Sequence, residues 1–362
     1  MDIDIERGKE MLNEIKRRNL PKTIPDSLTK DNWSAYRREM IVLFEKEEYG
    51  VTPEKPESIC WEVKKQHDSV GGKAVHNLVN LSFDTPKGEF TFPFDTVIPN
   101  SDQPVPMFVY ISFHPYGAGQ YLPIEEIIDS GYALAIVNYN DVTKDTEDNF
   151  ESGIANMYPR RNDGADWGKI GMWAFTASRM MDYIQTLPGV DREKIYVAGH
   201  SRLGKTAVWC GVQDERFAGV VSNDSGCSGA AVTRGKKGEH VVHITKNFPF
   251  WFCKNYQKYI ENEENMPFDQ HQLLALVAPR PVCVGSATED EWADPESELM
   301  GAYLAGEAYE MLGLKGLSGD IEVPVEPGEK RFGGKVGYQL RNGTHFLSRH
   351  DWLGYMEFFN GQ

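Results

Sequence analysis

The sequence predicts an α/β fold in which helices cover both faces of a mostly parallel central sheet, with a helical and antiparallel extension at the N-terminus. Two observations carry this prediction. After Pro106, short and nearly continuous apolar segments alternate with helical stretches, which is typical of strands buried on both faces of a parallel sheet. The chain has 362 residues, which suits one large α/β domain. The apolar segments are residues 108–113, 133–137, 195–198, 219–222, 282–284 and 336–340.

The region before these segments predicts two helices followed by antiparallel strands. Apolar residues recur near helical spacing in residues 3–18 and 31–49, and Asp31 is the expected N-cap of the second helix. Residues 59–97 alternate apolar and polar side chains between short turn sequences. This period of two is typical of antiparallel strands with one buried face.

The same patterns predict how the chain is organised. We expect residues 1–58 to form an N-terminal helical extension that packs on a main α/β domain of residues 59–362. The acidic stretch 141–151 and the Gly/Pro-rich stretch 313–337 interrupt the strand and helix alternation. We expect both to be solvated surface loops.

The chain is acidic, because 54 Asp and Glu residues outnumber 38 Lys and Arg residues and leave a formal net charge of −16. Such a surface disfavours nucleic acids and anionic membranes as partners, since both bind basic faces. No apolar stretch approaches the ~20 residues of a membrane-spanning helix. The acidic, amphipathic N-terminus differs from a signal peptide, so we expect a cytoplasmic protein.

The cysteines are odd in number and widely spaced, and no CxxC pair occurs. This pattern predicts buried free thiols rather than disulfides, zinc ligands or redox groups. The sequence therefore implies neither a metal nor an organic cofactor, and it leaves the oligomeric state open. The cysteines are Cys60, Cys210, Cys227, Cys253 and Cys283.

Residues 194–210 predict a strand, a glycine-flanked turn and a helix, and they match two incompatible motifs. Gly199 to Thr206 fits the phosphate-binding P-loop pattern G-x-x-x-x-G-K-[ST]. Alternatively, Ser201 lies on a nucleophile elbow, the tight strand-to-helix turn that holds the serine of an α/β-hydrolase above its sheet. The sequence departs from the usual G-x-S-x-G pattern by one residue, because the second glycine is Gly204.

An elbow requires an acid and then a histidine on loops that follow later strands. Asp290 follows the apolar segment 282–284, and His345 follows the segment 336–340. Asp290 lies 89 residues after Ser201, and His345 lies 55 residues after Asp290, which leaves room for further strand and helix units. We therefore favour a serine esterase with an α/β-hydrolase fold. A P-loop nucleotide-binding protein is the alternative from another class.

The elbow Gly-His-Ser-Arg-Leu-Gly-Lys of residues 199–205 resembles that of the glucuronoyl esterases, carbohydrate esterase family 15, which reads G-C-S-R-x-G-K. Histidine replaces the cysteine in some bacterial members. Members of this family are α/β-hydrolases that act on esters of glucuronic acid in xylan. The resemblance covers residues 100–358, and bacterial relatives are often labelled acetylxylan esterases. Further matching stretches are Asn223-Asp224-Ser225-Gly226, residues 233–239, residues 268–281 and Asp290-Glu291-Trp292.

The resemblance implies roles for the residues at the elbow and on the later loops. Ser201 would be the nucleophile, His345 the base, and Arg202 an oxyanion donor through its side chain and backbone. Members differ in the strand that carries the triad acid, which leaves Asp290 and Asp224 as candidates here. We favour Asp290, because Asp224 is shorter than the glutamate that is usual at its position.

The resemblance also implies a carbohydrate ester as substrate. Lys205, Glu239 and Trp292 fall where relatives contact the hydroxyls of the uronic sugar. The expected reaction is hydrolysis of a small-molecule or oligosaccharide 4-O-methyl-glucuronoyl ester through an acyl-enzyme. Hydrolysis of acetylated xylo-oligosaccharides is the alternative within the same class, because the same triad serves both.

Residues 200 and 346, near the expected site, differ from the fungal pattern. Fungal members bridge the cysteine before the nucleophile to a cysteine after the base, but these positions are His200 and Phe346 here, so no such disulfide can form. This departure agrees with a reduced cytoplasmic location.

His114 follows the first parallel strand, where a second oxyanion donor is expected. We predict a role for that backbone position rather than for the imidazole.

Overall fold

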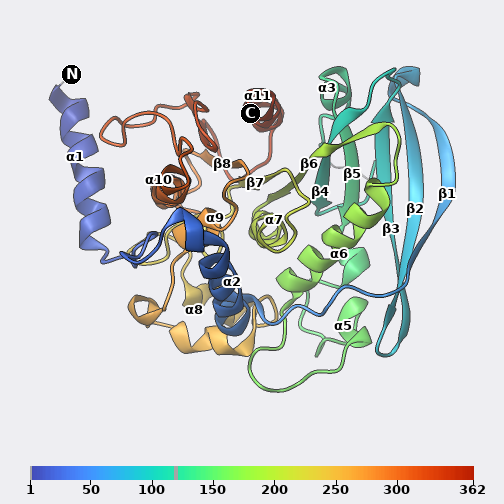
Figure 1. Cartoon of the computed structure of the whole chain (residues 1–362), viewed down its shortest axis with the longest axis horizontal. Coiled ribbons are helices and arrows are strands. Elements are labelled where there is room, and N and C mark those ends of the chain that lie inside the picture. Colours follow the sequence, from blue (N-terminus) through green and yellow to red (C-terminus); the bar gives the residue numbers. More distant parts are fainter. Residues whose placement is uncertain (1, 118–120) are drawn as a thin grey trace.

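The computed structural model describes residues 2–117 and 121–362, and within them ten strands form one sheet (Figure 1). Their order is β1-β2-β3-β5-β4-β6-β7-β8-β10-β9. The strands are β1 (Ile59–Ser69), β2 (Ala74–Thr85), β3 (Gly88–Pro99), β4 (Val105–Ser112), β5 (Ala133–Asn138), β6 (Val190–His200), β7 (Gly219–Asn223), β8 (Val282–Ala287), β9 (Lys330–Arg331) and β10 (Val336–Arg341). The helices and helical turns are α1 (Asp2–Arg17), η1 (Lys30–Asn32), α2 (Trp33–Phe44), η2 (Glu45–Tyr49), η3 (Val70–Gly72), α3 (Ile124–Asp129), α4 (Tyr139–Val142), α5 (Ile154–Met157), α6 (Lys169–Ile184), α7 (Arg202–Gln213), α8 (Val241–Asn247), η4 (Lys254–Tyr259), η5 (Glu263–Asn265), α9 (Gln270–Ala275), α10 (Pro295–Met311) and α11 (Arg349–Asn360).

The first three strands form the antiparallel part that the alternating pattern of residues 59–97 predicts. β1 pairs with β2 and β2 pairs with β3 along most of their lengths, and β3 continues antiparallel onto β5. β2 and β3 bury many of their side chains in alternation, whereas β1 is the sheet edge and is mostly exposed. The alternation of apolar and polar residues therefore indicates strands with one face buried.

The strands from β5 to β10 in the sheet order are parallel, which confirms the predicted parallel sheet. Successive side chains of these strands enter two separate cores. Val109 and Val197 pack in the core that includes residues of α6, α7, α9 and α10. Phe108 and Tyr196 pack in a second core with residues of α3 and α11. Both faces of the sheet are therefore covered by helices, as the continuous apolar segments predict.

The N-terminal segment departs from its prediction at the start of the second helix. The α-helix α2 begins at Trp33, and Asp31 lies in the preceding 3₁₀ turn η1, which Thr29 caps. Asp31 is therefore not an N-cap, because the chain tightens into a 3₁₀ turn before the α-helix starts. In η2, the ring of Tyr49 stacks on Trp209 of α7 with centroids 4.3 Å apart, so this segment shares a core with the sheet. The expected boundary between extension and main domain stays a prediction.

The acidic stretch 141–151 is only in part the solvated loop that its composition predicts. The Asp145 side chain is only 7% exposed. The fully buried ammonium of Lys169 pairs with Asp148 at 2.7 Å. A lysine buried in this way requires a compensating charge. The prediction is therefore wrong for Asp145 and Asp148, which pair with Arg202 and Lys169, whereas Asp141, Glu147 and Glu151 face water as predicted.

The five cysteines are free thiols, as predicted, and four of them are buried. Cys60 is the exception, because it lies on the exposed edge strand β1. Among the described residues, none of the helices combines the length and the apolarity that crossing a membrane requires.

Candidate active site

Ser201 lies in the tight turn between β6 and α7. Its backbone has φ 58° and ψ −130°, a strained conformation for a residue other than glycine and one expected of a nucleophile elbow. Its N–H donates to the carbonyl of Asn223 at 2.9 Å. A methyl group at Gly199 would overlap the carbonyl of Leu203, so the turn closes only with glycine there. The local sequence thus holds the serine at the carboxyl end of β6 and at the start of α7.

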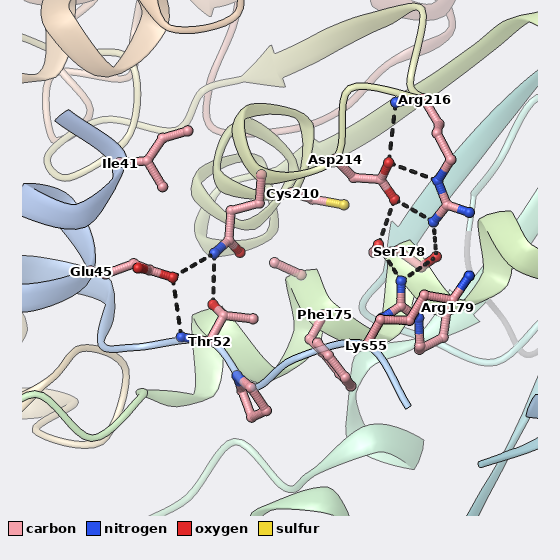
Figure 2. Close-up of a pocket in the computed structure, with 13 residues that line it drawn as sticks. Ile41, Glu45, Thr52, Lys55, Phe175, Ser178, Arg179, Cys210, Asp214 and Arg216 are labelled. Atoms are coloured by element: carbon pink, nitrogen blue, oxygen red, sulfur yellow. Dashed lines mark hydrogen bonds and ion pairs between the residues drawn. The ribbon is translucent and has the colours of Figure 1, made fainter. Parts of the chain in front are cut away.

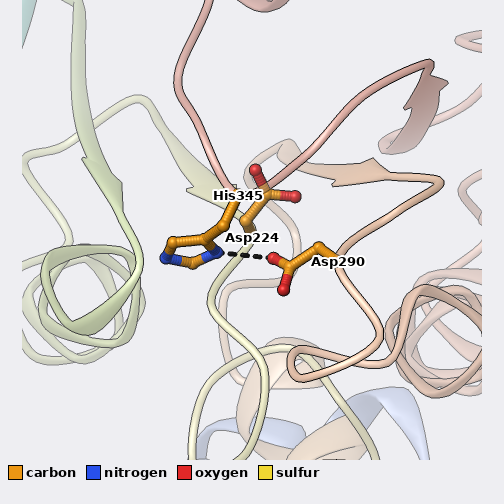
Figure 3. Close-up of side chains that lie close together, drawn as sticks. All are labelled: Asp224, Asp290 and His345. Atoms are coloured by element: carbon orange, nitrogen blue, oxygen red, sulfur yellow. Dashed lines mark hydrogen bonds and ion pairs between the residues drawn. The ribbon is translucent and has the colours of Figure 1, made fainter.

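His345 and Asp290 form a hydrogen-bonded pair at the same edge of the sheet. Nδ1 of His345 lies 2.5 Å from Oδ2 of Asp290 (Figure 3). Burial opposes ionisation of Asp290, but its hydrogen bond to His345 and the charge of that ring outweigh burial and lower the pKa of Asp290. The carboxylate therefore holds the imidazole with its proton on Nδ1, which leaves Nε2 as the basic nitrogen.

Asp224 lies beside this pair but makes different contacts (Figure 3). Ligand atoms of Asp224, Asp290 and His345 all lie within 4.8 Å of one another. Oδ2 of Asp224, however, is paired with Nη2 of Arg341 at 3.3 Å. Burial and the charge of Glu298 raise the pKa of Asp224 well above its ordinary value, against the opposing charge of Arg341. The pKa values of the two aspartates are thus shifted in opposite directions, and Asp290 is the one that ionises readily.

Two carboxylates and a histidine, as in Asp224, Asp290 and His345, could also bind a metal ion. In this geometry, however, Nδ1 of His345 and Oδ2 of Asp290 are joined by a hydrogen bond, so neither atom is free to bind an ion. The arrangement fits a histidine oriented by a carboxylate.

Arg341 holds the loop that carries His345, a contact that sequence reasoning missed. Its buried guanidinium donates to the carbonyls of Asn342 at 3.2 Å and Thr344 at 2.7 Å, and also to the carbonyl of Phe346. These carbonyls lie on both sides of His345. The available signal was an arginine at the end of a predicted strand, which by itself indicates nothing about its contacts.

The Arg202 side chain, directly after Ser201, is enclosed by one carboxylate and aromatic rings. Its Nη1 pairs with Oδ2 of Asp145. Its guanidinium carbon lies 4.5 Å from the ring centroid of Trp251 and 5.2 Å from that of Phe248. Its Nε is buried and finds no hydrogen-bond partner in the part of the chain that the structure describes. A buried cationic N–H next to a serine is well suited to bind an oxyanion.

Asp145 and Trp251 were also missed by sequence reasoning. Asp145 belongs to a run of acidic residues that composition alone marks as surface, and Trp251 belongs to an aromatic run that is ordinary core material. Their approach to Arg202 depends on the folded chain, because they lie 57 and 49 residues from it in sequence.

Lys205, Glu239 and Trp292 lie together next to the elbow. Lys205 follows Ser201 by one helical turn, and its side chain is only 4% exposed. Its ammonium donates to the carbonyl of Ser225 at 2.7 Å and pairs with Glu239 at 3.2 Å. The N–H of Glu239 donates to the carbonyl of Trp292 at 2.9 Å, and that tryptophan is 51% exposed. A buried, paired lysine does not suit the phosphate-binding role that the P-loop alternative requires.

Comparisons with known proteins agree with this geometry. A family model described as glucuronyl esterase of fungi matches residues 82–313. A carbohydrate esterase from an unknown prokaryotic organism is 35% identical over 93% of this chain and 88% of its own length. The chain belongs to the glucuronoyl esterase family.

Solved structures of the glucuronoyl esterase family share its fold. A glucuronoyl esterase from Solibacter usitatus matches with a TM-score of 0.87 and 32% identity, covering 95% of this chain and 97% of that chain. A promiscuous CE15 esterase from a marine bacterial metagenome matches with a TM-score of 0.86 and 34% identity, covering 95% and 96%. The predicted α/β-hydrolase fold is confirmed. The chain is a carboxylic ester hydrolase acting on carbohydrate esters, and the nucleotide-binding alternative is not supported.

In this glucuronoyl esterase family member, His200 packs against His345 where the fungal pattern has a disulfide. The two ring centroids are 4.4 Å apart. Nδ1 of His200 bonds to Oδ1 of Asn223 at 2.8 Å. Burial, together with the nearby His345, lowers the pKa of His200 to about 3, so this ring packs as a neutral group. Phe346 is exposed, and its ring centroid lies 6.0 Å from that of Tyr121.

His114 lies in the turn after β4, and its side chain is exposed. Its N–H donates to Oγ of Ser112 at 3.2 Å. Residues 118–120, in the same connection, lie outside the described chain, so the second oxyanion donor of this loop stays a prediction.

A cavity of about 600 Å³ lies between η2, α6 and α7 (Figure 2). Arg216 pairs with Asp214 at 2.7 Å, and Glu45 accepts from the N–H of Thr52 at 3.3 Å. The candidate catalytic side chains are not among the described residues that line it. Lys55 and Arg179, which also line this cavity, pair with Asp182.

Proposed function

We propose that this chain hydrolyses glucuronate esters of carbohydrates by two-step acyl transfer. In this proposal Ser201 is the nucleophile, His345 the general base and Asp290 the acid that orients it. The hydrogen bond of 2.5 Å between His345 and Asp290 supports the assignment of the acid, as does the lowered pKa of Asp290.

The reaction begins when Nε2 of His345 takes the proton of Ser201 and the serine oxygen attacks the ester carbonyl. The ionised Asp290 stabilises the imidazolium that forms. The imidazolium then protonates the leaving alcohol, which leaves an acyl-enzyme on the serine. A water molecule, activated by the same histidine, hydrolyses this intermediate and regenerates the serine.

Arg202 is the proposed donor to the oxyanion that develops in both steps. Its Nε has no other partner among the described residues. Its backbone N–H belongs to the first turn of α7, where helix N–H groups lack partners within the helix. Such donors act most strongly where negative charge appears only in the transition state.

Lys205, Glu239 and Trp292 are the proposed contacts to the sugar. The ion pair offers a donor and an acceptor for hydroxyls, and the exposed indole offers a flat apolar face, a combination suited to a sugar ring. In an acetylated xylo-oligosaccharide the sugar lies on the alcohol side of the ester, whereas in a glucuronate ester it lies on the acyl side that bonds to the serine. The Lys205–Glu239 pair, one helical turn from Ser201, is therefore the observation that carries the choice of a uronate over an acetyl ester. The similarity to a protein named glucuronoyl esterase supports the same choice.

Steady-state hydrolysis of benzyl glucuronate, 4-nitrophenyl acetate and acetylated xylo-oligosaccharides tests this proposal. We expect glucuronate turnover that is lost in Ser201→Ala and His345→Ala and retained in the control His350→Ala, an exposed histidine five residues on. Glu239→Gln is expected to raise KM for the glucuronate ester by about tenfold, the effect of one lost charged hydrogen bond, and to spare 4-nitrophenyl acetate. Turnover of acetyl esters alone would keep the triad and contradict the uronate assignment.

We also propose a cytoplasmic location. The five free thiols, four of them buried, support a reducing compartment. Fractionation of the source cells tests this proposal, and recovery of the activity outside the cytoplasm would contradict it.

A further inference from the structure

Asp145 anchors the guanidinium of Arg202. Its Oδ2 pairs with Nη1 of Arg202 and accepts from the hydroxyl of Tyr139 at 3.2 Å. Its Oδ1 accepts from Nε1 of Trp251 at 2.7 Å. Its own N–H donates to the side chain of Asn140 at 3.0 Å. These contacts hold the carboxylate in one orientation toward the arginine.

A buried lysine fixes the backbone on both sides of Asp145. Nζ of Lys169 donates to the carbonyls of Lys144 at 2.6 Å and Thr146 at 2.7 Å, and it pairs with Asp148 at 2.7 Å. The three donors of the ammonium are therefore all used on this one stretch. Burial of a lysine is costly unless it is fully compensated, so these contacts form and break together. The position of Asp145 is thus set by the main domain and not by a mobile loop.

Aromatic rings enclose the remainder of the guanidinium. Trp251 and Phe248 stack on each other with centroids 3.8 Å apart, and the ring centroid of Phe113 lies 5.6 Å from the guanidinium carbon. Rings at these positions favour the cation and displace water from it. Nε of Arg202 is buried without a partner among the described residues, but the side chain as a whole is 25% exposed, which leaves part of the guanidinium accessible to a substrate.

We propose that Asp145 is a positioning residue for ester hydrolysis with two separable effects. It orients Arg202 so that the part of the guanidinium that is not paired with Asp145 can donate to the oxyanion that forms at Ser201. It also neutralises the arginine, so that the site donates a hydrogen bond without carrying a net positive charge. The inference rests on the proposed roles of Ser201 and Arg202.

The second effect concerns release of the acid product. In the deacylation step, water adds to the acyl carbon, the bond to the serine oxygen breaks, and the serine regains a proton from His345. The released acid loses its proton to solvent at neutral pH and becomes a carboxylate next to Arg202, whichever acid the ester carried. An uncompensated arginine binds a carboxylate strongly. Asp145 therefore weakens product binding and allows turnover.

Asp145→Asn tests both effects in the full-length protein. Glu151→Gln is the matched control, because it removes one negative charge from an exposed residue of the same stretch. The first measurement is the second-order rate constant for labelling of Ser201 by an uncharged fluorophosphonate. The second is the inhibition constant of free glucuronate and of acetate. For Asp145→Asn we expect labelling about tenfold slower and inhibition about tenfold tighter, as for one charged contact, with less than about twofold change in the control.

Asp145→Glu separates charge from position. It keeps the negative charge but displaces the carboxylate, so we expect slow labelling together with inhibition constants near those of the wild type. Wild-type values for Asp145→Asn in both measurements would overturn the inference. Slower labelling with unchanged inhibition and a lower Tm would also overturn it, because that result describes a merely structural residue. If the wild type hydrolyses only acetyl esters, the uronate proposal fails, while labelling and acetate inhibition still decide the role of Asp145.

Discussion

Replacing Asp290 by asparagine separates the two carboxylates that compete for the role of triad acid. Asparagine keeps the size of the side chain but lacks the charge that stabilises the imidazolium of His345. The Asp290 side chain is 4% exposed, so solvent screens this interaction little. With about 4 Å between the charge centres and an effective dielectric constant of about 20, the attraction is worth about 4 kcal/mol. This loss corresponds to a kcat about 10³-fold lower.

Asp224→Asn is the matched control for this substitution, because Asp224 is also buried at the same edge of the sheet. Burial and the charge of Glu298 raise its pKa, and its Oδ2 is paired with Arg341. We therefore expect a change in kcat of less than about threefold. The assay is hydrolysis of the glucuronate ester at neutral pH, with Tm measured for each variant. A loss for Asp224→Asn as large as that for Asp290→Asn would refute the assignment of the acid.

Three further predictions concern the elbow, a buried acid and the histidine loop. Gly199→Ala is expected to cost more than about 3 kcal/mol of stability in chemical denaturation and to abolish activity, because its methyl group would lie 1.9 Å from the carbonyl oxygen of Leu203. Gly204→Ala, whose methyl group would lie 3.0 Å from a side-chain carbon and 3.2 Å from two backbone oxygens, should cost about 1 kcal/mol. Burial, opposed by a hydrogen bond from Gln270, raises the pKa of Glu48 from 4.5 to about 8. Between these two pH values the folded state binds a proton that the unfolded state has lost, so the folded state loses stability as the pH rises from 4.5 to about 8. Glu48→Gln should therefore raise Tm by about 5 °C or more above pH 8 and much less near pH 5, and an equal gain at both would contradict this. Arg341→Lys should lower kcat and the rate of fluorophosphonate labelling about tenfold with KM unchanged. The reason is that one ammonium cannot replace the planar guanidinium whose several N–H groups hold the loop of His345. A labelling rate equal to that of the wild type would show that the loop keeps its position without the guanidinium.

The elements that the sequence predicts well are those set by local patterns. The parallel strands follow from short apolar segments, because a strand buried on both faces needs apolar side chains at every position. Ser201, Asp290 and His345 were predicted as site residues for a related reason. Each lies directly after such a strand, and parallel strands bring their carboxyl ends to one edge of the sheet.

The failed predictions concern residues whose role depends on distant partners. Asp31 has the composition of an N-cap, but the chain there forms a 3₁₀ turn first. The acidic stretch 141–151 has the composition of a surface loop, yet it neutralises Lys169 and Arg202. Composition cannot distinguish a solvated carboxylate from one that pairs with a buried cation, because the difference lies in what the fold places opposite it.

The sequence by itself determined the fold class and predicted the nucleophile elbow and the order of the proposed triad, since all of these are recorded in residues close together or in the order of strands. The contacts that support Asp290 over Asp224 as the proposed acid appear only in the tertiary structure, because both residues follow strands at the same edge. The tertiary structure also revealed the Asp145–Arg202 pair, which joins residues 57 positions apart. Pairing, burial and the resulting pKa shifts depend on distances between such residues, and those distances exist only in the folded chain.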